Sequence, residues 1–205
     1  PREIIGSDHD EKKRARLGDD PGIRTAGDNR EAAAGTEIVV LAVKPQNLPD
    51  VLGEIAEGFG SDQLLVSILA GITTRRLEEE IGGRPAVVRV MPNTPALVKR
   101  GMAAICRGTH ASEDELEKVR GLMSAVGKTI VVPEELMNAV TAVSGSGPAY
   151  IFRFTELLAE AGRDLGLSED QADLLAAETV IGAGMMLKES GDPPGRLRRK
   201  VTSPG

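Results

Sequence analysis

The first two thirds of this chain repeat one pattern, a short run of apolar and largely β-branched residues followed by a helix-forming segment. Runs of this kind are typical of buried strands. The expected strands are residues 3–6, 37–43, 64–69, 86–90, 102–106 and 129–132. The expected helices are residues 10–17, 28–34, 49–57, 74–81 and 112–126. This alternation predicts an α/β fold with a mostly parallel sheet that helices cover on both faces.

The pattern changes near residue 135, beyond which we expect helices and no strand. Ser168 and Gln171 have the spacing of a capping box that begins a long apolar helix, and another apolar helix precedes it. Two such helices cannot bury their own surfaces, so they predict a second copy of the chain as partner. Gly182 and Gly184 lower helix stability and suggest a close helix–helix approach at this point. We therefore predict an α/β domain at residues 1–134 and a helical domain at 135–205, in at least a homodimer.

Composition excludes several classes of function. The net charge is −6 and the pI about 5.1, so nothing favours nucleic acid or an anionic membrane surface as a partner. No apolar run approaches the roughly 20 residues of a membrane span. The single cysteine, Cys106, lies in an apolar run and is expected to be inert, while His9 and His110 lack metal-ligand neighbours. We expect a protein of the reducing cytoplasm with no metal site.

Three consecutive expected strands end in unusual loops. Residues 42–45 read AVKP and place Lys44 at the rim of the sheet, and residues 69–71 read LAG and leave room beside the backbone. Residues 91–95 read MPNTP and hold Asn93 between two prolines, each of which fixes its own φ. Ligands of α/β sheets bind beyond the carboxyl ends of the strands. These loops therefore predict the floor of a site for one extended ligand.

The glycine-rich loop G-x-G-x-x-G, which binds the phosphates of a dinucleotide, does not occur after any expected strand. We expect the first strand, that loop and the first helix to precede Pro1, which makes residues 3–6 the second strand. Its end carries Ser7 and Asp8. A hydroxyl with nearby cations suits the extra phosphate of NADP, whereas a carboxylate suits the ribose of NAD. The nearby cations are Lys12, Lys13 and Arg14. We favour NADPH over NADH for this reason. Asp8 is the feature that favours NADH, so NADH remains the alternative cofactor.

Four motifs together indicate a family. They are AVKPQ at residues 42–46, RVMPNTP at 89–95, SGSGPAY at 144–150 and KVTSPG at 200–205. In these motifs, and over nearly its whole length, the sequence resembles the pyrroline-5-carboxylate reductase family. The resemblance implies a Rossmann-like dinucleotide-binding domain, with its first strand and glycine-rich loop missing, and an all-α domain for dimerisation and substrate. It implies an NADPH- or NADH-dependent oxidoreductase of proline biosynthesis that reduces 1-pyrroline-5-carboxylate to L-proline.

The resemblance and the strand ends together imply the residues of the site. The expected cofactor residues are Ser7, Asn29, Ala42, Val43, Lys44, Pro45, Ala70, Gly71 and Asn93. The expected substrate residues, whose amides and hydroxyls would hold the carboxylate, are Thr202, Ser203, Pro204 and Gly205. We expect Asn93 and Ser203 to converge on one small pocket, across a subunit boundary if need be.

No catalytic residue is assigned from the sequence. In the family, a glycine and then a threonine that contacts the substrate nitrogen follow the substrate loop, and the printed sequence stops at Gly205. We therefore expect these 205 residues by themselves to be inactive or nearly so, although the resemblance implies that their parent protein is an enzyme. A cyclic imine is already electrophilic, so its reduction depends mainly on position, which is consistent with a site poor in His, Cys and paired carboxylates.

Two other functions remain open at this stage. One is another Rossmann reductase of small hydroxy or keto acids. Such enzymes place a catalytic lysine on a helix of the second domain, and Lys188 lies too near the end of its expected helix to be a good candidate. The other is a catalytically incompetent dimerisation module that has lost cofactor binding.

Overall fold

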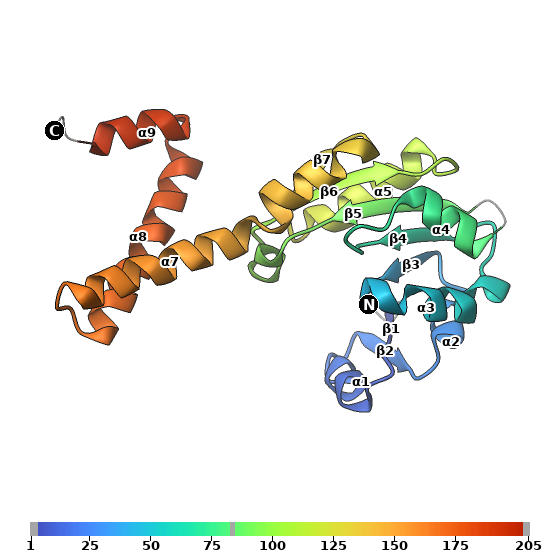
Figure 1. Ribbon diagram of the computed structural model, residues 1–205. Helices are drawn as coiled ribbons and strands as arrows, with labels where there is room; N and C mark the ends of the chain where they lie inside the picture. Colours follow the sequence, from blue (N-terminus) through green and yellow to red (C-terminus); the bar gives the residue numbers. More distant parts are fainter. Residues whose placement is uncertain (1–3, 83–84, 203–205) are drawn as a thin grey trace. The chain divides into compact units, whose positions relative to one another are not determined.

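The computed structural model describes residues 4–82 and 85–202, and its chain divides into two compact units, residues 1–145 and 146–205. The first unit holds all the described strands (Figure 1). These are β1 (Ile4–Ser7), β2 (Ile23–Ala26), β3 (Ile38–Leu41), β4 (Leu64–Ser67), β5 (Ala86–Met91), β6 (Gly101–Arg107) and β7 (Gly127–Val131). The expected domains at residues 1–134 and 135–205 stay a prediction.

The strands form a five-stranded sheet in the order β3-β4-β5-β6-β7 and a separate two-stranded sheet of β1 and β2. Every neighbouring pair is parallel except β5 and β6, which are antiparallel. The expectation of a mostly parallel sheet is therefore confirmed. Strand β2 was not expected from the sequence, because its four residues include polar Arg24 and Thr25 and give no continuous apolar run.

Helices cover both faces of the larger sheet, as expected. The helices of the first unit are α1 (Glu11–Gly18), α2 (Asn29–Ala33), α3 (Leu48–Ile55), α4 (Thr74–Ile81), α5 (Glu113–Ser124) and α6 (Met137–Val140). Leu65 of β4 packs into the cluster formed with α3 and α4, and its neighbour Val66 packs into the cluster formed with α5. Successive residues of a strand face opposite sides of a sheet, so two different hydrophobic layers enclose β4.

Short 3-10 turns and one π-helical turn connect these elements. The turns are η1 (Pro45–Asn47), η2 (Ala56–Gly58), η3 (Thr94–Val98) and η4 (Glu134–Leu136), and the π turn is η5 (Thr141–Gly145). Two of them begin at loops singled out in the sequence. The turn η1 follows Lys44, and η3 follows Asn93.

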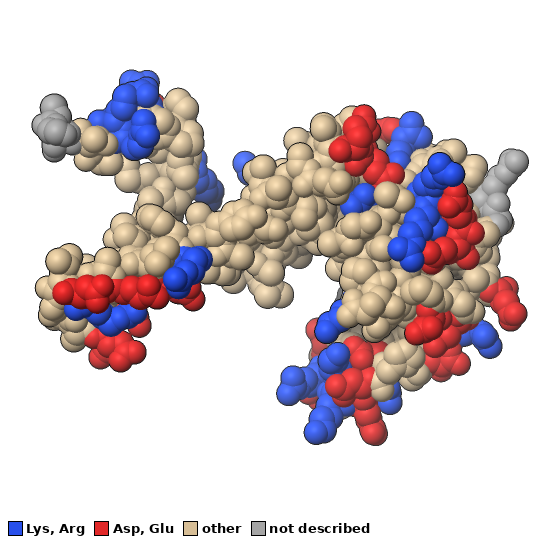
Figure 2. Space-filling view, in the orientation of Figure 1, with Lys and Arg blue, Asp and Glu red and all other residues tan. Residues whose placement is uncertain are grey.

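The second unit is made of α7 (Gly147–Asp164), α8 (Glu169–Glu189) and α9 (Pro194–Val201). The expected capping box is present at the start of α8, where Ser168 and Gln171 bond each other's backbone amides. The buried contact between α7 and α8 consists of Ala159, Ala172 and Ala176. Basic side chains of α9 form a patch on the face shown in Figure 2. Arg196 and Lys200 of this helix both pair with Asp192.

Large apolar side chains of the second unit remain exposed. On α7 they are Tyr150, Ile151, Phe152, Phe154, Leu157 and Leu158, and on α8 they are Leu174, Leu175, Ile181, Met185, Met186 and Leu187. Since α7 and α8 bury only alanines between them, these side chains are available to a partner. No helix of the described residues is long and apolar enough to cross a lipid bilayer.

The close helix approach expected at Gly182 and Gly184 does not occur within the described chain. A Cβ placed on either glycine would have no atom within 4 Å. The approach occurs at Gly162 of α7, where a Cβ would lie 3.1 Å from Leu167 Cδ1 and 3.3 Å from Ala172 Cβ.

Replacing Gly162 by leucine should force α7 and α8 apart. We expect the variant Gly162→Leu to lose about 1–3 kcal/mol of unfolding free energy by overpacking, measured by urea denaturation. The matched control is Gly121→Ala on the exposed face of α5, where a Cβ meets nothing within 4 Å. It should gain up to about 1 kcal/mol from helix propensity. An unchanged midpoint for Gly162→Leu would contradict this account of the helix contact.

Candidate functional site

The three unusual strand ends lie at one edge of the larger sheet. Strands β3, β4 and β5 are adjacent and parallel, so their carboxyl ends point the same way. Lys44 is exposed just beyond β3, and Gly71 is exposed beyond β4 with a φ of +76°, a conformation that favours glycine. Ser67 at the end of β4 is buried, and its hydroxyl accepts a hydrogen bond from the Leu69 amide at 3.3 Å. The edge therefore presents open backbone and one cation.

The side-chain amide of Asn93 holds the loop after β5 in place. Its Oδ1 accepts a hydrogen bond from the Met102 amide at 2.8 Å, at the start of β6. Its Nδ2 donates to the carbonyl oxygen of Ser144 at 3.2 Å and to Ser144 Oγ at 3.3 Å. One side chain thus connects β5, β6 and the start of the SGSGPAY motif.

A second contact joins the same two motifs. A Cβ on Gly145 would lie 2.5 Å from the methyl carbon of Met91, so a larger residue here would displace the end of this side chain. Gly145 is also the last residue of the π turn η5, and π turns within helices are frequent at functional sites. The structure therefore brings together two loops that the sequence analysis had treated as separate.

The end of β1 carries an acidic residue whose carboxylate is already engaged. Asp8 accepts a hydrogen bond from the Asp10 amide at 2.9 Å and lies 3.5 Å from Lys13 Nζ. The Asp10 amide, with help from Lys13, holds the pKa of the Asp8 carboxyl below its ordinary value. Arg14 donates to the carbonyl oxygens of Asp8 and His9, at 2.6 and 3.1 Å. The strand end next to Ser7 is therefore bordered by fixed cations.

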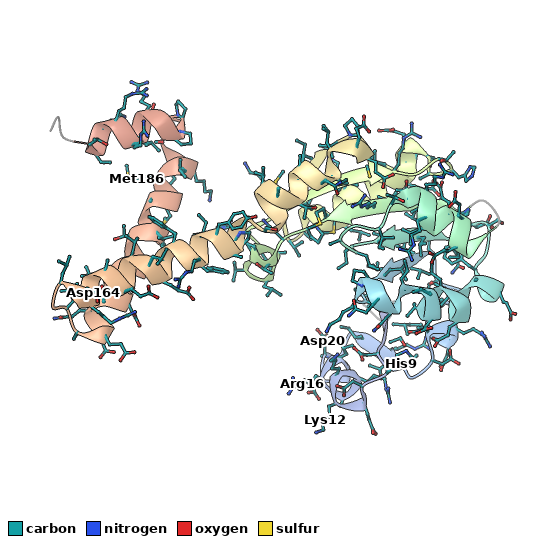
Figure 3. All side chains as sticks on the ribbon, in the orientation of Figure 1. His9, Lys12, Arg16, Asp20, Asp164 and Met186 are labelled. Atoms are coloured by element: carbon teal, nitrogen blue, oxygen red, sulfur yellow. The ribbon has the colours of Figure 1, made fainter. Side chains whose placement is uncertain are left out.

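Lys12 and Arg16 belong to the same helix but point elsewhere. Figure 3 shows both side chains projecting from α1 into solvent, and both are exposed. Among the described residues, Lys13 and Arg14 are thus the basic side chains of α1 that reach the end of β1.

Two other expected site residues take part in local contacts. Asn29, at the start of α2, donates from Nδ2 to Glu54 Oε2 of α3 at 2.6 Å. Thr202 follows α9, and its hydroxyl donates to the Arg198 carbonyl oxygen at 2.9 Å. The remaining expected substrate residues, Ser203, Pro204 and Gly205, lie outside the described residues. The site assignments of all these residues stay predictions.

An ion pair that the sequence analysis missed lies near the site. Arg89 of β5 is 3% exposed, and its Nη1 donates to Glu134 Oε1 at 3.1 Å. Glu134 also accepts from the amide of Thr74 at 2.8 Å and from its hydroxyl at 2.7 Å, at the start of α4. A charged residue within the apolar run 86–90 is the sequence signal for a buried partner. A groove of about 510 Å³ beside the pair is lined by Thr74, Arg75, Arg107, Gly108, Thr109 and Glu134.

The environment of Glu134 and Cys106 fixes their protonation. Burial alone would raise the pKa of the Glu134 carboxyl, but the hydrogen bonds from Thr74 and Arg89 outweigh burial and hold this pKa below its ordinary value. Burial, with the nearby charge of Glu134, raises the pKa of the Cys106 thiol to about 12. This agrees with the expectation of an inert thiol. The described residues contain no group of three or more His, Cys, Asp or Glu that could hold a metal ion.

A mostly parallel sheet covered by helices on both faces, followed by a helical unit, is a Rossmann-like architecture. Comparisons with known proteins identify the family. Residues 134–205 match the model described as pyrroline-5-carboxylate reductase dimerisation, and residues 1–71 match the model described as NADP oxidoreductase coenzyme F420-dependent. The chain belongs to the pyrroline-5-carboxylate reductase family.

Individual relatives lead to the same family. The chain is 43% identical over 205 residues to pyrroline-5-carboxylate reductase of Synechocystis sp., covering all of this chain and 76% of the relative. It is 41% identical to the reductase of Pseudomonas aeruginosa, covering 98% of this chain and 74% of the relative. The chain thus spans about three quarters of the length of these relatives.

Solved structures of this family have the same fold. The pyrroline-5-carboxylate reductase of Coxiella burnetii superposes with a TM-score of 0.87 at 36% identity, covering 98% of this chain and 76% of that one. The enzyme of Plasmodium falciparum, solved with NADP bound, gives a TM-score of 0.87 at 32% identity, covering all of this chain and 76% of that one.

The pH dependence of stability should report the Glu134 contacts. Because the folded-state pKa of Glu134 is lowered, its contribution is fully present above the unfolded-state value of about 4.5 and is lost as the pH falls through the folded-state pKa. We therefore expect wild-type protein to be more stable than Glu134→Gln at neutral pH, with a difference in unfolding free energy that narrows as the pH falls below the unfolded-state value. Urea denaturation of both proteins across this range measures the difference. A difference independent of pH would contradict the assignment.

Proposed function

We propose that this protein reduces 1-pyrroline-5-carboxylate to L-proline with NADPH or NADH, as an oxidoreductase of proline biosynthesis. The observation that carries the proposal is the strand-end edge, where Asn93 is fixed by Ser144 in a chain of this reductase family. The reaction needs the imine carbon to be held against a hydride donor, and this edge offers an ordered loop beside open backbone.

The residues at this edge fit a dinucleotide. When bound, the nicotinamide cofactor supplies the hydride. Small or backbone-exposing residues at the ends of β3 and β4 leave space for a flat ring or a ribose. The proposed cofactor residues are Ser7, Asn29, Ala42, Val43, Lys44, Pro45, Ala70, Gly71 and Asn93.

We further propose that NADPH is preferred. The carboxylate of Asp8 is occupied by the Asp10 amide and by Lys13, so it is poorly available to a ribose hydroxyl. The hydroxyl of Ser7 and the ammonium of Lys13 are the chemistry that an additional phosphate would use.

The substrate carboxylate is proposed to bind the backbone and hydroxyls of residues 202–205. Backbone amides and a serine hydroxyl can hold a carboxylate without a dedicated acid. On this proposal residues 1–134 bind the dinucleotide, and residues 135–205 serve dimerisation and substrate binding, in a cytoplasmic homo-oligomer.

The activity is tested by following NADPH and NADH oxidation after addition of the cyclic imine, and separately after addition of 2-keto acids. The assay compares the 205-residue chain with a longer form that includes any flanking residues of its reading frame. We expect the imine to be reduced by the longer form, with higher kcat/KM for NADPH. In the variant Asn93→Asp, a carboxylate oxygen replaces the amide nitrogen that donates to the Ser144 carbonyl oxygen. Two hydrogen-bond acceptors then face each other, so kcat/KM should fall by at least about tenfold.

Other outcomes of this assay would count against the proposal. Faster turnover of keto acids would favour another Rossmann reductase. No binding of NADPH by the longer form, together with intact dimers, would favour a dimerisation module without catalytic function.

The dimer is tested on the exposed apolar face of α8. Leu175 is 56% exposed in the described chain, and a charge at this position would be buried by a partner. We expect Leu175→Glu to weaken dimerisation by at least about tenfold in sedimentation velocity, since burying an unpaired charge is unfavourable. The matched control is Leu122→Glu on α5, where Leu122 is 54% exposed. It should leave the dimer intact, and equal effects of both variants would contradict the placement of the interface.

A further inference from the structure

One continuous segment connects the buried ion pair to the candidate site. We call residues 134–145, which comprise η4, α6 and η5, the strap. Both ends of the strap bond to β5 or to the loop that follows β5. Glu134 reaches Arg89 within the strand, and Ser144 reaches Asn93 just beyond it.

The first end of the strap is fixed by charge. Glu134 takes hydrogen bonds from Arg89 and from two donors of Thr74, all between 2.7 and 3.1 Å. Arg89 is buried, and its Nε and Nη2 have no hydrogen-bond partner among the described residues. Glu134 is thus the described carboxylate that compensates this guanidinium. Removing it would leave a buried positive charge without compensation, which is far more destabilising than loss of a surface pair.

The middle of the strap is fixed by packing. Met137 is fully buried and forms a cluster with Ala104 and Cys106, against which Met91 packs. Thr141 donates its hydroxyl to the Met137 carbonyl oxygen at 2.8 Å, at the passage from α6 into the π turn. A displacement at Glu134 therefore has a packed path to the far end.

The second end of the strap contacts the site. Ser144 accepts both hydrogen bonds that Asn93 Nδ2 donates, and Gly145 lies directly against the Met91 methyl group. The position of Ser144 consequently sets the orientation of the Asn93 amide. Asn93 in turn fixes the start of β6 through Met102.

We propose that Glu134 is a positioning residue of the site. Its hydrogen bonds with Arg89 and Thr74 fix the first end of the strap. The strap in turn sets the position at which Ser144 bonds Asn93. The relevance of Glu134 to catalysis rests on the proposed function, whereas the mechanical coupling from Glu134 to Met91 does not. A residue with a merely structural role would change stability without moving the opposite end of the strap.

The coupling is measured by methyl NMR of isotope-labelled methionines in the intact protein. The chain has six methionines, of which Met91 and Met137 contact the strap or lie in it, whereas Met123 and Met186 lie on α5 and α8. We expect Glu134→Ala to shift the methyl signals of Met91 and Met137 and to leave those of Met123 and Met186 unchanged. An unmoved Met91 signal would overturn the proposal.

A second variant separates position from stability. Arg89→Leu combined with Glu134→Ala removes both charges, so no uncompensated guanidinium remains, and much of the lost stability should return. The anchor of the strap is still absent, so the Met91 signal should stay displaced. Its return to the wild-type position would show that Glu134 acts on stability alone. The control Glu37→Gln removes the exposed pair with Lys118, whose atoms are 2.7 Å apart, and should move none of these signals.

Activity gives an independent readout. In a form that reduces the imine, the double variant should lose about tenfold to hundredfold in kcat with little change in KM for the imine, because misplacement of about 1 Å has effects of this size. Unchanged kcat alongside a displaced Met91 signal would overturn the catalytic role of the strap. If the wild-type protein does not reduce the imine, the proposed function fails, and the methyl signals still decide whether Glu134 positions the strap.

Discussion

The burial of β4 and β5 between two hydrophobic layers fixes the positions of the loops that follow these strands. Leu65 and Val87 face one layer, Val66 and Val88 face the other, and each such side chain contributes about 1.5–3 kcal/mol when fully buried. Strands held in this way end at fixed points. The polar loops beyond them therefore keep their positions without forming a core of their own, and a ligand meets an edge that is already ordered.

The strand-end edge has a second level of control in its polar contacts. Asn93 joins three segments through one amide, and the Glu134 carboxylate joins η4, α4 and β5. The side chains of Asn93 and Glu134 are short, and each forms hydrogen bonds with more than one segment. A shift in one segment is therefore passed to the others. Orientation in a site with few titratable groups depends on such contacts rather than on an acid or base.

Local signals in the sequence predicted the parts of the fold that depend on local physics. The apolar runs located six of the strands, and the capping box at Ser168 located the start of α8. Strand β2 was missed because Ile23–Ala26 has no apolar run. The pairs Arg89–Glu134 and Asn93–Ser144 join residues that are 45 and 51 positions apart in the sequence. Helix and strand periodicity relates only residues that are close in sequence, so it could not predict these pairs. For the same reason the sequence could suggest an edge of the sheet for the site, and the site stays a prediction, but the sequence could not suggest the hydrogen bonds between these residues.

The alanine contact between α7 and α8 has a consequence for how the protein behaves in solution. Because Ala159, Ala172 and Ala176 supply so little buried surface, the second unit gains much of its stability only when another copy covers it. Folding of this unit is then linked to protein concentration, and the melting temperature rises as the sample becomes more concentrated. Dilution acts on such a chain as a mild denaturant.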